Sequence, residues 1–155
     1  MEKEALKRIF EFLKEKEGHN APFMWKLINN QPLTKEELNV KGDLYLRDSK
    51  ITSLPKGLKV GRYLDLSYSK IKSLPEGLEV SGTLDLTDTE VTSLPKGLKV
   101  GYGLNLAYCD NITSLPKGLK VGGDLDIHDT PLAKYTYDEL IEMIKPGFIK
   151  GEIIR

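Results

Sequence analysis

One phrase recurs along this chain at an interval of about 20 residues, and such a repeat strongly limits the folds that the chain can adopt. Each unit has the form L-x-V-x-x-x-L-x-L-x-x-S/T-x-I/V-x-S-L-P-x-G. The opening leucine recurs at Leu38, Leu58, Leu78, Leu98 and Leu119, so three intervals are 20 residues long and the last is 21. A period of this length is typical of a protein built from stacked copies of one small unit.

Each unit contains two short stretches in which apolar and polar residues alternate, LKV and YLDL in the second unit. Because successive side chains of a β-strand point to opposite faces, the alternation predicts strands with Leu64 and Leu66 inside and Asp65 outside. One unit is too small to bury its own apolar face. Stacked units can bury it, since each strand pairs with the equivalent strand of the next unit and the leucines form continuous interior rows.

A proline and a glycine mark the end of each unit. Proline fixes its own φ, and glycine readily adopts the left-handed conformation. We therefore expect the chain to turn a corner once in each unit, with a left-handed glycine at the turn. These glycines are Gly57, Gly77, Gly97 and Gly118.

The motif L-x-L-x-x-S/T-x-I/V-x-x-L-P resembles the short bacterial type of leucine-rich repeat, from Leu38 to about Leu132. The resemblance implies a solenoid of about four and a half coils and suggests a bacterial or phage origin. In that family one position of the buried bend is commonly Asn or Cys, whose side chain bonds to backbone groups. Here the position holds Ser49, Ser69, Thr89, Cys109 and Thr130. We expect hydroxyl groups to replace asparagine in this role, and Cys109 to belong to the core.

The flanking segments lack the repeat, and we expect them to cover the ends of the solenoid. Residues 2–17 have apolar side chains at helical spacing, residues 22–30 predict a second helix, and Thr34 to Glu37 has the form of a capping box. A capping box at Thr136 to Glu139 predicts a C-terminal helix that Pro146 ends, and the tail FIKGEIIR predicts an edge strand.

The expected fold is an α+β repeat protein, a leucine-rich-repeat-like β-solenoid of short parallel strands with an N-terminal helical cap and a C-terminal helix cap. We expect a single domain over residues 1–155. Its parts are the N-terminal cap (1–37), the solenoid (38–132) and the C-terminal cap (133–155).

Charge and cysteine content narrow the possible partners and compartments. Lys plus Arg equals Asp plus Glu, at 23 each, so no net charge steers the chain to nucleic acid or to an anionic membrane. A single cysteine cannot form an internal disulfide, which favours a reducing compartment. The charged N-terminus does not resemble a signal peptide, and no apolar run is long enough to predict a membrane-spanning helix. We expect a cytoplasmic protein, in the host cytoplasm if a phage encodes it.

Function on such a scaffold is expected at the outward positions of the strands and of the bends that follow them. Across the units these positions are acidic and contain several tyrosines. The predicted partner-binding residues are Tyr45, Tyr63, Asp65, Tyr68, Asp85, Asp88, Asn105, Tyr108, Asp126 and His128. Tyrosine offers a large contact area at low entropic cost, and an acidic field favours a basic partner.

The sequence therefore predicts a non-catalytic protein-binding module with a basic protein partner, monomeric and without a cofactor or metal. Charge reversal at Asp65 and Asp85 is expected to abolish binding and to leave the fold intact. A structural subunit that packs into a larger assembly or a homo-oligomer is the alternative function. Light scattering distinguishes the two.

Other interpretations of the outward residues stay open. The acidic positions could be solvated copies of a duplicated unit, because two carboxylates about 5 Å apart in water repel by only about 1 kcal/mol. They could hold calcium, although the repeat of calcium-binding solenoids is absent. His128 lies near Asp126 and Asp129 in the sequence and could act as a general base, but no outward nucleophile lies nearby. Lysines and glutamates on the opposite edge predict exposed ion pairs rather than a nucleic-acid groove.

Overall fold

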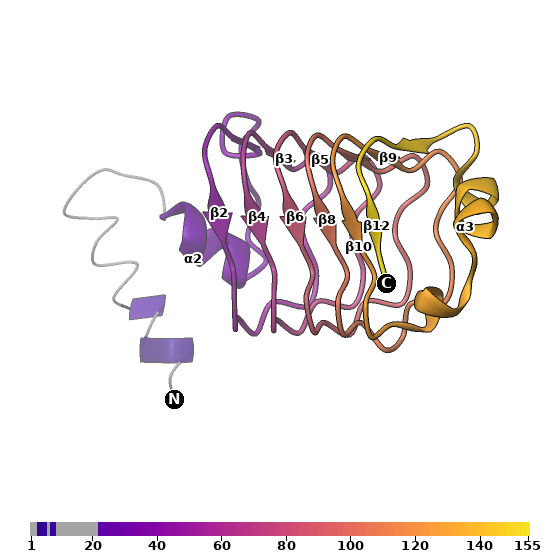
Figure 1. Cartoon of the computed structure of the whole chain (residues 1–155). Helices are drawn as coiled ribbons and strands as arrows, with labels where there is room; N and C mark the ends of the chain where they lie inside the picture. Colours follow the sequence, from indigo (N-terminus) through magenta and orange to yellow (C-terminus); the bar gives the residue numbers. More distant parts are fainter. Residues whose placement is uncertain (1–2, 6, 9–21) are drawn as a thin grey trace. The chain divides into compact units, whose positions relative to one another are not determined.

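The computed structural model describes residues 3–5, 7, 8 and 22–155 of the chain (Figure 1). Contacts divide the chain into two compact units, Met1–Leu33 and Thr34–Arg155.

The first unit contains helix α2, Phe23–Ile28, which follows Pro22 and ends at Asn29. The side-chain amide of Asn29 donates a hydrogen bond to the carbonyl of Trp25 at 2.9 Å, which satisfies one of the last carbonyls of the helix. The helix predicted in residues 22–30 is thus confirmed. The helix predicted in residues 2–17 lies mostly outside the described residues. Within this range the structure describes residues 3–5, 7 and 8, and all of them are helical. Whether these helices cover the solenoid stays a prediction.

The second unit is a parallel β-solenoid of about four turns (Figure 1). Every winding contributes one short strand to each of two six-stranded sheets. The first sheet contains β1 (Asn39–Val40), β3 (Lys59–Val60), β5 (Glu79–Val80), β7 (Lys99–Val100), β9 (Lys120–Val121) and β11 (Phe148–Ile149). The second contains β2 (Leu44–Tyr45), β4 (Leu64–Asp65), β6 (Leu84–Asp85), β8 (Leu104–Asn105), β10 (Leu125–Asp126) and β12 (Ile153–Ile154).

Equivalent leucines of successive windings lie in register inside the solenoid. Leu64 pairs with Leu84, and Leu84 pairs with Leu104. These side chains are almost completely buried, as are Leu66, Leu86 and Leu106, which form the next interior row. Full burial of one such side chain contributes about 1.5–3 kcal/mol, so the rows make a large favourable contribution to the stack. The predicted interior rows are confirmed.

The backbone turns through left-handed residues twice in each complete winding. Gly57, Gly77, Gly97 and Gly118 have φ between 70° and 79°, as the sequence predicts. A second left-handed position follows each of β2, β4, β6, β8 and β10 and is never glycine. Its occupants are Asp48, Tyr68, Asp88, Tyr108 and Asp129, with φ between 52° and 59°. Aspartate tolerates this conformation, whereas tyrosine adopts it rarely.

The hydroxyl groups of the buried bend behave differently in threonine and in serine. Thr89 donates to the Leu86 carbonyl at 2.8 Å, and the sulfur of Cys109 donates to the same carbonyl at 3.0 Å. The hydroxyls of Ser49 and Ser69 are buried and have no hydrogen-bond partner among the described residues. The prediction is therefore correct for threonine and wrong for these serines. Serine lacks the methyl group that restricts χ1 in threonine, so its hydroxyl is not held toward the carbonyl.

The last part of the chain forms a helix and two strands. After the short helix η1, Pro131–Lys134, helix α3 runs over Tyr137–Ile144. The predicted capping box is present between Thr136 and Glu139, and Leu140 is fully buried. The amide of Gly118 donates to the carbonyl of Ile144 at 2.7 Å, which ties the helix end to the last winding. The predicted edge strand is confirmed, because β11 and β12 add one strand to each sheet.

Candidate functional site

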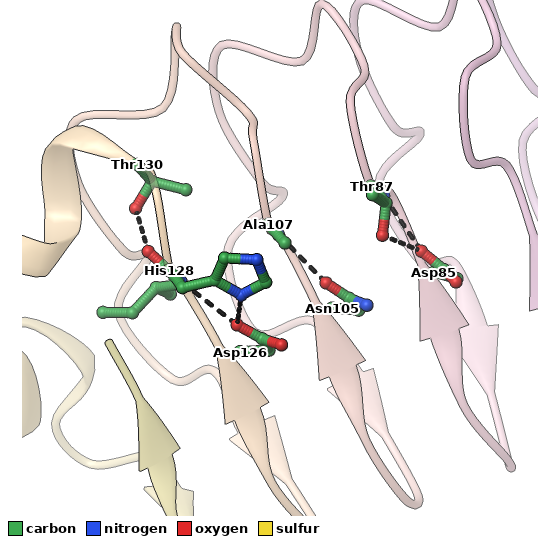
Figure 2. A network of polar contacts seen from close by, with 8 residues as sticks. Asp85, Thr87, Asn105, Ala107, Asp126, His128 and Thr130 are labelled. Carbon is green, nitrogen blue, oxygen red and sulfur yellow. Dashed lines mark hydrogen bonds and ion pairs between the residues drawn. The ribbon is translucent and has the colours of Figure 1, made fainter.

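The second residues of β4, β6, β8 and β10 are Asp65, Asp85, Asn105 and Asp126, and each side chain bends back onto its own chain. Figure 2 shows this arrangement for Asp85, Asn105 and Asp126. In every case Oδ1 accepts a hydrogen bond from the backbone amide two residues later, at 2.9–3.1 Å. The hydroxyl of Thr87 also donates to Asp85, at 2.6 Å. This Asx-turn geometry satisfies a backbone amide that the strand ladder leaves unpaired. These side chains therefore have a structural role in the bend.

The structure corrects the expectation that Asp65 lies open on the surface. Its residue is only 7% exposed, because Oδ1 accepts from both the amide and the hydroxyl of Ser67, at 3.0 and 2.6 Å. Asp85 is half-buried, and the hydroxyl of Tyr63 donates to its Oδ2 at 2.9 Å. Reversing both charges would break these hydrogen bonds, so this variant is unsuited to testing binding with the fold intact.

The phenol of Tyr63 is the most strongly perturbed tyrosine. Burial raises its pKa above the usual 10.0, and the hydrogen bond to Asp85 raises the pKa further because it favours the neutral phenol. The ring also contacts Tyr45 edge to face, with the centroids 5.8 Å apart. The nearby Asp43 carboxylate raises the pKa of Tyr45. Both phenols are therefore neutral at neutral pH.

The structure brings His128 and Asp126 together, with Nδ1 of the histidine 2.6 Å from Oδ1 of the aspartate (Figure 2). The ring of Tyr108 packs edge to face on His128, with the centroids 4.9 Å apart. The geometry positions the imidazole as a packing partner for Tyr108. In the part of the chain that the structure describes, no three His, Cys, Asp or Glu side chains are grouped as a metal site would require.

The exposed aromatic side chains of this face are those of Tyr45, Tyr68 and Tyr108, which are 60%, 42% and 50% exposed. A hollow of about 290 Å³ lies between Tyr68 and Tyr108 and is lined by Asp88, Asp110 and other polar residues. We call Tyr45, Tyr68, Asp88, Tyr108 and Asp110 the tyrosine face. Asp88 is exposed and belongs to the predicted set, whereas Asp110 does not.

Sequence reasoning missed the charged and amide residues Lys70, Glu90, Asp110 and Asn111, which also line this hollow. A signal for two of them was present. The fourth unit is one residue longer than the others between Cys109 and Ile112, and the longer bend carries Asp110 and Asn111. This insertion is confined to one unit.

The opposite sheet carries a second hollow, of about 430 Å³, lined by Lys99, Lys120, Lys150 and Phe148 among others. The predicted exposed ion pair is present between Lys59 and Glu79, at 3.1 Å. Lys99 and Lys120 are adjacent in register, and neither forms an ion pair with a described residue. The charge at this position therefore alternates over the first three coils only, because Lys99 is followed by Lys120.

The buried Cys109 contacts the hydroxyl of Thr89, with the sulfur and oxygen 3.5 Å apart. Burial raises the pKa of the thiol, so the sulfur stays protonated and unreactive at neutral pH. Its predicted place in the core is confirmed.

No protein family, curated protein sequence or solved structure matches this chain. Among the described helices, none combines the length and apolar character needed to cross a lipid bilayer.

Proposed function

We propose that this chain is a non-catalytic, cytoplasmic protein-binding module of the leucine-rich-repeat type, whose tyrosine face binds a basic protein partner. The N- and C-terminal helices act as caps of the solenoid in this proposal. The burial of Leu140 and Ile144 supports this role for α3.

The observation that carries the proposal is the backbone conformation of Tyr68 and Tyr108. The equivalent residue in the other three windings is aspartate, which fits the left-handed conformation better. A left-handed non-glycine residue costs about 1–2 kcal/mol, and neither exposed ring contributes to the core. Folding alone does not explain two large aromatic side chains here, whereas partner binding does, because tyrosine is enriched at protein interfaces.

Affinity capture from the native host tests this proposal with two matched baits. Tyr45→Ser combined with Tyr108→Asn alters the tyrosine face, and Lys59→Ser combined with Lys99→Ser alters the opposite sheet. We expect the first pair to lose the partner that the wild-type chain captures and the second pair to retain it. If both baits retain the partner, the tyrosine face is not the surface that binds it.

One observation favours the alternative of a self-assembling subunit. Strand β12 pairs only with β10, so its outer edge is open among the described residues, and Ile154 is exposed there. Open edges pair readily with other strands. Light scattering over a concentration series separates the two functions. A dimer that forms with rising concentration and disappears in Ile154→Lys would support assembly, whereas we expect a monomer throughout.

A further inference from the structure

We propose that the hollow between Tyr68 and Tyr108 binds an arginine side chain of the partner, with the guanidinium between the two rings and close to Asp88 and Asp110. This inference rests on the proposed function, because it names the chemical group through which a basic partner is recognised.

The spacing of the windings suits a planar cation. Strands β4, β6 and β8 lie side by side (Figure 1). Tyr68, Asp88 and Tyr108 hold the same left-handed position after these three strands. Adjacent windings are about 4.8 Å apart, which places the two tyrosine positions about 10 Å apart. A planar group midway between the two tyrosine positions lies about 5 Å from each of them. This is within the roughly 6 Å over which an aromatic ring attracts a cation.

Contacts with the outer windings hold the two rings apart. The guanidinium carbon of Arg47, from the preceding winding, lies 4.5 Å from the ring centroid of Tyr68. On the other side Tyr108 packs against His128 of the following winding. Each ring thus contacts a side chain on the side away from Asp88, and the hollow lies between the rings. Arg47 also shows that the Tyr68 ring accepts a guanidinium in this protein.

The charges lining the hollow favour a cation. Asp88, Glu90 and Asp110 line it together with a single cation, Lys70. Glu90 is shared by Lys70 at 3.7 Å and Lys72 at 3.4 Å. The carboxylates of Asp88 and Asp110 make no hydrogen bond or ion pair with any described residue, in contrast to those of Asp65 and Asp85. Two carboxylates are therefore available to a ligand.

Arginine fits this arrangement better than lysine. The guanidinium is flat, is less strongly hydrated than an ammonium group and stacks on aromatic faces, and its donors can bond to a carboxylate at the same time. An ammonium group offers charge without the planar shape. The hollow is thus suited to an arginine on a partner peptide.

Nuclear magnetic resonance titration of the full-length protein tests the inference with three small probes, N-acetyl-arginine amide and its citrulline and lysine analogues. Citrulline keeps the shape of arginine and lacks the charge. We expect the arginine probe to shift the backbone amides of Tyr68, Asp88 and Tyr108. The other two probes should bind several-fold more weakly.

Matched variants locate the binding. Asn tolerates the left-handed conformation, so Tyr68→Asn, Tyr108→Asn and Asp88→Asn should fold. Loss of either ring is expected to lower the affinity for the arginine probe about two- to fivefold, and loss of the Asp88 charge is expected to lower it about fivefold. Asp129→Asn changes the same column outside the hollow and should leave the affinity unchanged. Thermal unfolding verifies that each variant is folded.

Three results would overturn the inference: equal affinity for the citrulline probe, equal affinity for the lysine probe, or the same loss in Asp129→Asn as in Asp88→Asn. If the arginine probe does not bind but host capture still depends on Tyr45 and Tyr108, this inference fails and the proposed function stands. If host capture is also independent of the face, both fail.

Discussion

At the scale of single residues, aspartate has two roles on the second sheet. Asp65 and Asp85 accept hydrogen bonds from their own bends, whereas the carboxylates of Asp88 and Asp110 make no hydrogen bond or ion pair with a described residue. The two roles differ in the hydrogen-bond partners of the carboxylate and not in the residue type. Only the second pair has carboxylates available to recognise another molecule.

Asp85→Asn and Asp85→Ala separate the structural role of this residue from its charge. The asparagine amide oxygen can still accept from the Thr87 amide, as Asn105 accepts from Ala107 at 2.9 Å. Alanine leaves the Thr87 amide and the Tyr63 hydroxyl without an acceptor, at a cost of about 1–3 kcal/mol. Urea denaturation should show a loss below about 1 kcal/mol for asparagine and a larger loss for alanine. Equal losses would contradict the Asx-turn role.

The raised pKa of Tyr63 predicts how stability depends on alkaline pH. The folded state favours the neutral phenol, so this contribution is fully present below the unfolded pKa of 10.0 and is lost as pH rises above that value. The free energy of unfolding should therefore decrease above about pH 10, and Tyr63→Phe should reduce the slope. Denaturant unfolding at pH 9 to 12 measures how the free energy of unfolding changes with pH. Tyr102→Phe, at an exposed tyrosine, is the control. Identical slopes for the two variants would contradict the assignment.

At the scale of elements, close contact between windings limits the size of residues at the corners. A Cβ atom at Gly101 would overlap the carbonyl oxygen of Ser81 in the preceding winding, whereas one at Gly42 would meet nothing within 4 Å. Gly101→Ala must therefore separate two windings, at a cost of at least about 1–3 kcal/mol. Gly42→Ala should change the free energy of unfolding much less. Thermal unfolding of the two variants measures the difference, and equal stability would show that the windings are packed less closely.

The elements were largely predictable because each depends on its own unit. The alternation around Leu64 predicted the interior rows, and Gly57 predicted a left-handed corner, since period and turn chemistry are local properties. The burial of Asp65 was not predictable, because it depends on Ser67 and on the bend conformation. The hollow was not predictable either, because it depends on contacts between residues at least 20 positions apart in the sequence, such as Arg47 with Tyr68.

At the scale of the whole molecule, the solenoid unit presents two surfaces of opposite charge. The tyrosine face carries free carboxylates, and the opposite sheet carries Lys99, Lys120 and Lys150 around a hollow. With equal numbers of acidic and basic residues overall, recognition depends on these local surfaces. We therefore predict that one face, and not the net charge, decides which partner binds.

Hydroxyl-radical footprinting of the captured complex tests this claim most directly, because the chain carries exposed tyrosines both on the face and away from it. Tyr45, Tyr68 and Tyr108 lie on the face, while Tyr102 and Tyr137 are at least half exposed elsewhere. Mass spectrometry should show oxidation of the first three reduced by the partner and oxidation of the other two unchanged. Protection of Tyr102 or Tyr137 with full oxidation of Tyr68 and Tyr108 would contradict the account.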